Sequence, residues 1–236
     1  MRLVLPSTLL ILSGCMTVDA TSNNIAQSQL RERSEARVKL GIGYLKQGNM
    51  IKARENFEMA LKHDPNYYRA QLSLAHYFEQ VEETESAKHL YQSAFNQHAN
   101  NGDVLNNYGT FLCRYGQYEQ ADTLFNQAVK QPSYYRISTS YENAALCSLK
   151  AGNKQRAQEY FHRALAHQPG RPTSSLNLAK LEIENRSYVD ARLRLLRFHQ
   201  RYGAQKSSLK LLIELEQGAG NTTLEHKYRG QLAQFD

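Results

Sequence analysis

The fold of this 236-residue chain is decided by residues 34–67, which read SEARVKLGIGYLKQGNMIKARENFEMALKHDPNY. The same pattern of small, aromatic and proline residues returns every 34 residues, and two extra residues precede the fourth copy. The small residue at the centre of the first five copies is Gly41, Ala75, Gly109, Ala145 and Ala179. A weaker sixth copy begins near Lys206. The chain therefore repeats one structural unit about six times.

Each copy is expected to fold as two antiparallel helices, at residues 35–47 and 52–63 in the first copy. Gly41 and Ala60 are small where the two helices cross, and Pro65 cannot continue the second helix. The pattern resembles the tetratricopeptide repeat, whose small, aromatic and proline positions fall at these offsets. The resemblance implies an all-α fold, a right-handed solenoid of about six helix-turn-helix units, in which stacking closes the core.

The expected units of the solenoid together span residues 34–236. Ile213 occupies the small-residue position of the last unit, where a close helix crossing should not accept it, so that unit is expected to be a degenerate cap. The expected boundaries are 34–67, 68–101, 102–135, 138–171, 172–205 and 206–236.

The charge balance gives a formal net charge of +7, with lysine and arginine spread over every unit. A nucleic-acid-binding protein more often has a dense basic stripe or a known binding module. We therefore expect no nucleic-acid partner, although mild basicity can favour an acidic partner or an anionic membrane surface.

The N-terminus has the features of a secretory signal: a basic start at Met1-Arg2 and an apolar core over residues 3–12. The following Leu-Ser-Gly-Cys sequence, ending at Cys15, resembles the bacterial lipobox. It implies a lipoprotein signal peptide over residues 1–14, acylation of Cys15, transport by the lipoprotein sorting machinery and anchoring to a membrane. The alternative is a plain signal peptide, or a cytosolic N-terminus in which the cysteine occurs by accident.

Two features of the sequence after Cys15 predict where the protein is held. Met16 stands where an aspartate would, by resemblance to sorted lipoproteins, retain the protein in the inner membrane. We therefore predict an outer-membrane, periplasm-facing location. Residues 15–33 are expected to be the lipidated N-terminus and a flexible tether, and residues 27–37 can extend the first helix or cap it.

Two further cysteines, Cys113 and Cys147, lie near the ends of the front helices of the third and fourth units. Because these helices stack side by side and a periplasm is oxidising, the two thiols are candidates for a disulfide bond. The alternative is that both are small buried apolar residues.

Catalytic and metal-binding motifs are missing from the sequence. The histidines do not form an H-E-x-x-H pattern, and neither a Gly-rich phosphate loop nor a G-x-S-x-G motif is present. We therefore expect a protein that is not an enzyme and that needs no cofactor or metal.

A binding role is favoured instead, because the front helices of such a solenoid line a concave groove. Asparagine recurs at one groove position in three successive units, as Asn107, Asn143 and Asn177. A side-chain amide there can both donate hydrogen bonds to a peptide backbone and accept them from it. The alternative is that asparagine simply suits this position and that some leucines lie between units. The predicted groove residues are Asn106, Asn107, Thr110, Arg114, Glu142, Asn143, Leu146, Leu149, Lys150, Leu176, Asn177 and Lys180.

The tyrosine pair Tyr134-Tyr135 lies in the one turn that the two-residue insertion lengthens. Tyrosine has an apolar body and a polar tip, so it serves equally well inside a fold and at an interface. Each of these two side chains is therefore either a packing plug or an interface anchor.

The lipobox, the short tether and the six repeats together resemble the type IV pilus biogenesis and stability lipoproteins, often called pilotins. The sequences of residues 106–113 and 142–147, and the inserted turn at 132–137, are similar to those of that family. The resemblance implies a monomeric outer-membrane lipoprotein whose groove binds the pilus secretin subunit and promotes its targeting and multimerisation. The alternative is a lipoprotein adaptor that scaffolds peptidoglycan hydrolases or proteases.

Overall fold

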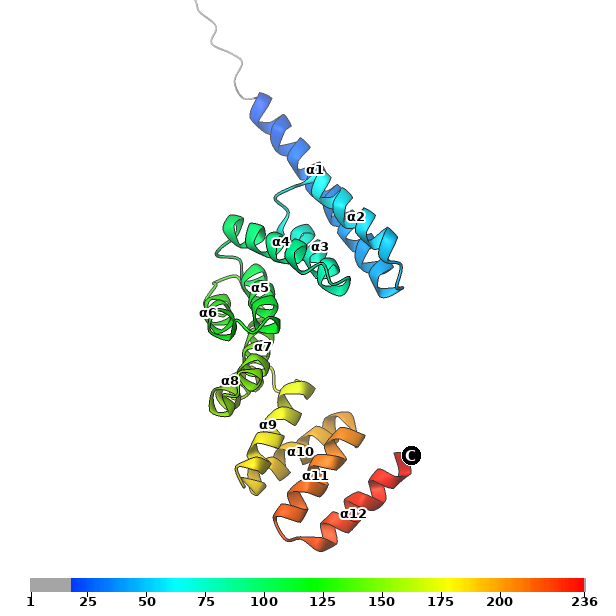
Figure 1. Ribbon diagram of the computed structural model, residues 1–236, viewed down its shortest axis with the longest axis vertical. Coiled ribbons are helices and arrows are strands. Elements are labelled where there is room, and N and C mark those ends of the chain that lie inside the picture. The colour runs from blue at the N-terminus through cyan, green and yellow to red at the C-terminus, as the bar shows by residue number, and fades with distance from the viewer. Residues whose placement is uncertain (1–17, 236) are drawn as a thin grey trace, which may run out of the picture. The chain divides into compact units, whose positions relative to one another are not determined.

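The computed structural model describes residues 18–235, so the expected signal peptide and Cys15 lie outside the described residues. The described residues form twelve α-helices and a final short 3-10 helix, without strands (Figure 1). This confirms the predicted all-α tetratricopeptide-repeat architecture. The elements are α1 (Val18–Lys46), α2 (Met50–His63), α3 (Tyr68–Gln80), α4 (Thr84–Gln97), α5 (Gly102–Arg114), α6 (Tyr118–Ala128), α7 (Ile137–Lys150), α8 (Lys154–His167), α9 (Pro172–Glu184), α10 (Tyr188–Tyr202), α11 (Lys206–Gly218), α12 (Thr222–Leu232) and η1 (Ala233–Phe235).

The helices are packed as two compact units, with the division between Ala87 and Lys88. In the first unit α1 packs against α2, and α3 packs against both. In the second unit α5 pairs with α6, α7 with α8, α9 with α10, and α11 with α12. Front helices of neighbouring pairs also touch, as α5 does α7 and α9 does α11. The second unit is thus a stack of helical hairpins.

The first helix is longer than expected, because α1 begins at Val18 whereas residues 15–33 were expected to contain a flexible tether. The part of α1 that precedes residue 35 packs against its neighbours at two described residues. The guanidinium of Arg31 forms an ion pair with the buried Asp64 and lies 4.5 Å from the centre of the Tyr67 ring, and Ser34 is fully buried. These contacts extend the helix that the repeat pattern starts at residue 35.

The core is made by residues that recur at the repeat spacing. The alanine near the start of each back helix is completely buried in five successive pairs, at Ala53, Ala87, Ala121, Ala157 and Ala191. An aromatic or leucine side chain four residues later fills the space beside it, as Phe57 does. In the last pair Ile213 packs in a cluster with Leu209 and Leu212.

Replacing Gly109 with leucine is expected to lower the free energy of unfolding by about 1–3 kcal/mol, because it overpacks the crossing of α5 and α6. A Cβ atom at this position would lie 3.0 Å from the Phe125 ring and 3.3 Å from the backbone oxygen of Ala121. Urea denaturation measures the change. The matched control is Gly43→Leu, where an added Cβ has no neighbour within 4 Å. Equal stability of the Gly109 variant and the wild type would contradict the close crossing.

The turn between the two helices of a pair uses one backbone conformation throughout. The residue concerned has a φ between 62° and 79° in every pair: Gly48, Glu82, Gly116, Gly152, Arg186 and Gly220. Glycine enters this left-handed region without a steric penalty, whereas other residues are strained there. The turn therefore favours glycine at this position. In the two pairs where Glu82 and Arg186 replace it, the backbone adopts the same conformation with some strain.

The inserted turn between α6 and α7 separates the two tyrosines. The ring of Tyr134 is buried and packs directly on Gly102, where a Cβ atom would lie 2.4 Å from the ring. Its hydroxyl lies 2.8 Å from the Ser140 hydroxyl. Tyr135 is 80% exposed. Tyr134 is therefore the packing plug that joins the start of α5 to α7.

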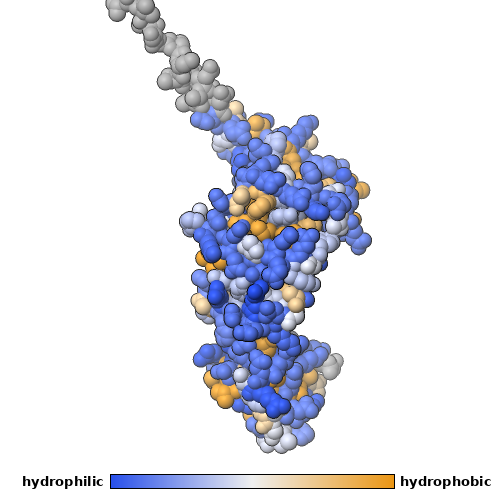
Figure 2. Space-filling model, turned by 60° about the vertical axis from the view of Figure 1, so that its left-hand side comes forward, coloured by the Kyte–Doolittle hydropathy of each residue, from blue (hydrophilic) through white to orange (hydrophobic). Residues whose placement is uncertain are grey.

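The described residues contain no helix that combines the length and the apolar character needed to cross a membrane. Hydrophilic side chains cover most of the face drawn in Figure 2, with scattered apolar patches between them.

Candidate functional site

The candidate site is a cavity of about 360 Å³ on the front helices α5 and α7 of the second unit. Six of the twelve predicted groove residues line it, and the Cys113, Cys147 and Phe125 side chains complete its wall. The six are Thr110, Arg114, Asn143, Leu146, Leu149 and Lys150. The cavity lies within the size range of small ligand sites and can accommodate one or two side chains of a peptide.

The wall of this cavity is apolar at its base and polar at its rim. Leu146 and Leu149 are half-buried and present apolar surface, whereas Arg114 and Lys150 are exposed at the edge. Partly exposed leucines in a concave site typically mark a surface for a partner. The two rim cations would favour a peptide that carries negative charge near its apolar anchor.

Cys113 and Cys147 are bonded to one another in the structure, and their Cα atoms are 5.8 Å apart, within the usual range for a disulfide. The bond joins α5 to α7 directly beneath the cavity. Because it links neighbouring front helices, it holds the two walls of the site in one position.

The three recurring asparagines differ from the expectation, because their amide groups are already used as donors. Asn107 and Asn177 donate from Nδ2 to the backbone oxygens of Asp103 and Thr173, one turn earlier in their own helices. Asn143 donates to Asn106 Oδ1 at 3.0 Å, across the two front helices. Asn107 and Asn177 therefore each keep one amide N–H and the amide oxygen for a peptide, whereas Asn143, which also donates to the Thr110 hydroxyl at 3.4 Å, keeps only its amide oxygen.

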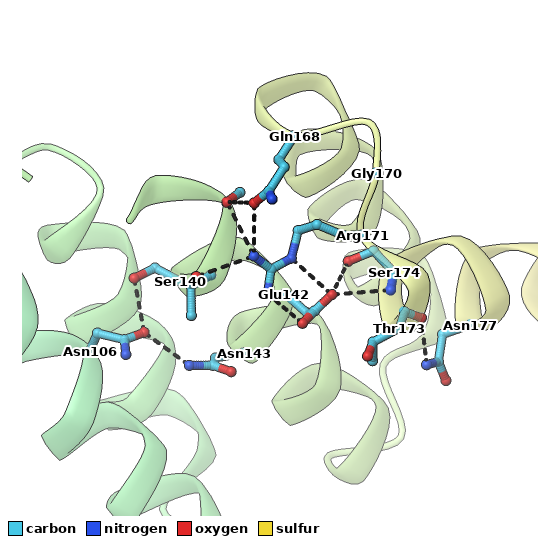
Figure 3. A network of polar contacts seen from close by, with 12 residues as sticks. Asn106, Ser140, Glu142, Asn143, Gln168, Gly170, Arg171, Thr173, Ser174 and Asn177 are labelled. Carbon is cyan, nitrogen blue, oxygen red and sulfur yellow. Dashed lines mark hydrogen bonds and ion pairs between the residues drawn. The ribbon is translucent and has the colours of Figure 1, made fainter. Parts of the chain in front are cut away.

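Asn106 does not face the groove, since it is 6% exposed and its side-chain oxygen is hydrogen-bonded inside the second unit. Its Oδ1 atom accepts hydrogen bonds from the Ser140 hydroxyl at 2.9 Å and from Asn143 (Figure 3). Thr110 in turn donates to the backbone oxygen of Asn106 at 2.9 Å. Asn106 therefore aligns α5 with α7, and Asn143 is the member of this network that reaches the cavity.

Glu142 is also internal. Its carboxylate receives two hydrogen bonds from the Arg171 guanidinium, at 3.0 and 2.6 Å, and two from the backbone N–H and hydroxyl of Ser174 (Figure 3). Burial raises the pKa of Glu142, but the hydrogen bonds from Arg171 and Ser174 together outweigh it, so the pKa lies below its ordinary value. Arg171 also donates to Gln168 and Thr139. This network fastens α9 to α7.

The remaining predicted residues lie on α9 and do not line the cavity. Leu176 is half-buried and packs against the apolar cluster of the last two helix pairs. Lys180 is exposed on the same helix. The structure thus concentrates the site on α5 and α7.

The roles of two residues in this region were not predicted from the sequence. Arg171 and Ser174 hold Glu142, yet they lie in a turn and at the start of a helix, outside the expected groove positions. A signal for them was present, because Pro172 marks the first turn of α9 and places its neighbours opposite the preceding front helix. Among the described residues, histidine, cysteine and acidic side chains form no group of three that could bind a metal ion.

Comparison with known proteins places the chain among tetratricopeptide-repeat proteins. Residues 69–132 match the family of YpiA-like, C-terminal tetratricopeptide repeats, and residues 144–201 match a further tetratricopeptide-repeat family. An uncharacterized protein of Haemophilus influenzae is 40% identical over 141 residues, which cover 60% of this chain and 76% of that protein.

Two relatives are named for a role in type IV pili. The type IV pilus assembly protein PilF of Pseudomonas aeruginosa is 34% identical over 86% of this chain and 81% of its own length. A solved PilF structure superimposes with a TM-score of 0.77 at 32% identity, over 88% of this chain and 93% of that one. The structure of PilW, a type IV pilus biogenesis factor, has a TM-score of 0.75 at 26% identity, over 84% and 91%. The chain therefore belongs to the family of tetratricopeptide-repeat proteins that includes PilF of Pseudomonas aeruginosa.

Proposed function

We propose that this protein is an outer-membrane lipoprotein of type IV pilus biogenesis that binds the pilus secretin through the cavity on α5 and α7. The observation that carries the proposal is this cavity, with half-buried Leu146, Leu149 and Asn143 in its wall and exposed Arg114 and Lys150 at its edge. The protein's membership of the PilF family supports the role in pilus biogenesis. The names of the relatives favour this role over an adaptor for peptidoglycan hydrolases or proteases.

The mechanism requires no bond-making step. A secretin segment places an apolar side chain against Leu146 and Leu149 and donates a backbone N–H group to the amide oxygen of Asn143. The disulfide and the Asn106–Asn143 hydrogen bond keep the α5 and α7 walls preorganised, which lowers the ordering cost of binding. The lipidated Cys15 carries the bound subunit along the lipoprotein sorting route to the outer membrane.

The proposal is tested by deleting the gene and measuring secretin multimers in the outer-membrane fraction on a semi-native gel. We expect the multimer to be lost, with the secretin monomer left in the inner membrane, and the wild-type gene to restore it. Unchanged multimers and normal pili in the deletion strain would refute the proposal.

Complementation separates the contributions of the cavity and the anchor. Leu146→Gln combined with Lys150→Glu should reduce multimers to near the deletion level at normal protein abundance, because the base and rim of the cavity are both altered. Leu196→Gln changes an exposed leucine outside the cavity and should complement fully. Cys15→Ser should leave the protein soluble in the periplasm and still able to bind the secretin in a pull-down. Its continued fractionation with membranes would contradict lipidation.

A further inference from the structure

A second cavity, of about 600 Å³, opens between the back helices α8 and α10. It shares no residue with the cavity on α5 and α7. The basic residues of its lining are His162 on α8 and Arg194, Arg197 and Arg201 on α10, and Asp190 is the one acidic residue in that lining. The lining therefore carries an excess of positive charge.

The repeat explains why this space is open. At the equivalent interface between α6 and α8, Tyr160 is 7% exposed and its hydroxyl donates to Asp122 at 2.8 Å, while Asn126 donates to that hydroxyl at 2.7 Å. One repeat later, Arg194 takes the position of Tyr160 and His162 that of Asn126. Because the Arg194 guanidinium turns to Glu182, which it contacts at 2.9 and 2.6 Å, no side chain closes the gap.

Two of the three arginines have no carboxylate partner among the described residues, so their guanidinium groups can pair with an acidic ligand. Within the described residues, Arg197 and Arg201 form no ion pair, whereas Arg194 is satisfied by Glu182. The guanidinium of Arg201 lies flat against Gly170, where an added Cβ atom would be 2.5 Å from its central carbon. The Tyr202 hydroxyl also donates to the Gly170 oxygen. The Arg201 guanidinium therefore packs beside Gly170 at the edge of the cavity.

The spacing of these residues along α10 matches an extended peptide. Leu193, which is 49% exposed, Arg197 and Arg201 recur every four residues on one helix face, or about 6 Å apart along the axis. Alternate side chains of an extended chain point to one side about 6.6 Å apart. An apolar residue followed by two acidic residues, each separated by one residue, therefore matches the Leu193–Arg197–Arg201 row.

We propose that the cavity between α8 and α10 binds an extended acidic segment of a partner protein, with two carboxylates on Arg197 and Arg201 and an apolar side chain on Leu193. Arginine suits carboxylates because its planar guanidinium donates two parallel hydrogen bonds. A single lipid phosphate would engage one end of a row that extends about 12 Å, so a polypeptide fits better. The proposal is independent of secretin binding at the other cavity.

The test uses the full-length protein and a fluorescein-labelled peptide, Gly-Leu-Ser-Glu-Ser-Glu-Gly, in fluorescence anisotropy at low salt. We expect binding, and a loss of affinity of at least about tenfold when both glutamates are replaced by glutamine. Arg197→Gln combined with Arg201→Gln should weaken binding of the acidic peptide by a similar factor. Circular dichroism should show an unchanged melting temperature, because both side chains lie at the protein surface.

The matched control is Lys130→Gln combined with Lys210→Gln, which removes two positive charges from exposed positions outside the cavity. It should bind the peptide as the wild type does. Equal weakening in the control would reduce the effect to general charge attraction and overturn the proposal. Arginine-dependent binding to phosphatidylglycerol vesicles, with no binding to the peptide, would overturn it in favour of a lipid headgroup.

Discussion

Replacing Glu142 with alanine is expected to lower the free energy of unfolding by about 3–5 kcal/mol at neutral pH. The substitution leaves the Arg171 guanidinium, whose side chain is 17% exposed, without its carboxylate partner. It also removes the acceptor of the Ser174 N–H and hydroxyl. Both donors remain largely shielded from water, so neither recovers its hydration, and the attachment of α9 to α7 is weakened.

The pH dependence gives this prediction a second readout. Because the pKa of Glu142 is lowered in the folded protein, the folded state binds fewer protons than the unfolded state at mildly acidic pH. The stabilisation by this network is therefore complete above the unfolded pKa of about 4.3 and is lost as the pH falls through the folded value. Urea denaturation between pH 3 and pH 7 measures this dependence.

Glu142→Gln is the matched variant for the Glu142 prediction, because it keeps the shape and one acceptor but cannot ionise. It should be destabilised at pH 7 and show a flatter loss of stability on acidification than the wild type. A Glu142→Gln protein that is as stable as the wild type at pH 7, and equally sensitive to acid, would show that the carboxylate contributes nothing.

Removing the disulfide by replacing Cys113 and Cys147 with serine is expected to lower the free energy of unfolding by about 2–4 kcal/mol. The bond closes a loop of 34 residues that contains α6 and the lengthened turn before α7. Cross-linking this loop restricts the unfolded chain, and the effect grows with loop length. The loss should fall on the second unit, where both cysteines lie.

The comparison of oxidised and reduced wild-type protein in urea checks the disulfide prediction without any substitution. Reduction should reproduce most of the destabilisation of the double serine variant, and adding reductant to that variant should change nothing further. Non-reducing mass spectrometry of periplasmic material should find the two cysteine peptides joined. Two free thiols there would contradict the prediction.

The sequence alone was sufficient for the architecture, because the structural requirements of each unit recur at fixed spacing. A small residue is needed wherever two helices cross, and a residue with positive φ wherever they turn. The roles of Gly109 and Gly116 could therefore be predicted from their positions in the repeat. The paired positions of Cys113 and Cys147 followed from the same register. The expectation was less accurate for residues 18–33, since their helix depends on contacts such as that of Arg31 with Asp64.

Only the tertiary structure decided which of the predicted groove residues line the cavity. Asn143 and Asn106 were both predicted groove residues, but the hydrogen bond between them directs Asn106 inward and leaves Asn143 at the cavity. The Glu142 carboxylate is likewise held away from the cavity by its hydrogen bonds with Arg171, a turn residue. Repeat spacing places a side chain on one face of a helix, whereas its exposure depends on partners from neighbouring helices. The periodic pattern therefore determined the scaffold, and non-periodic polar contacts between repeats determined the site.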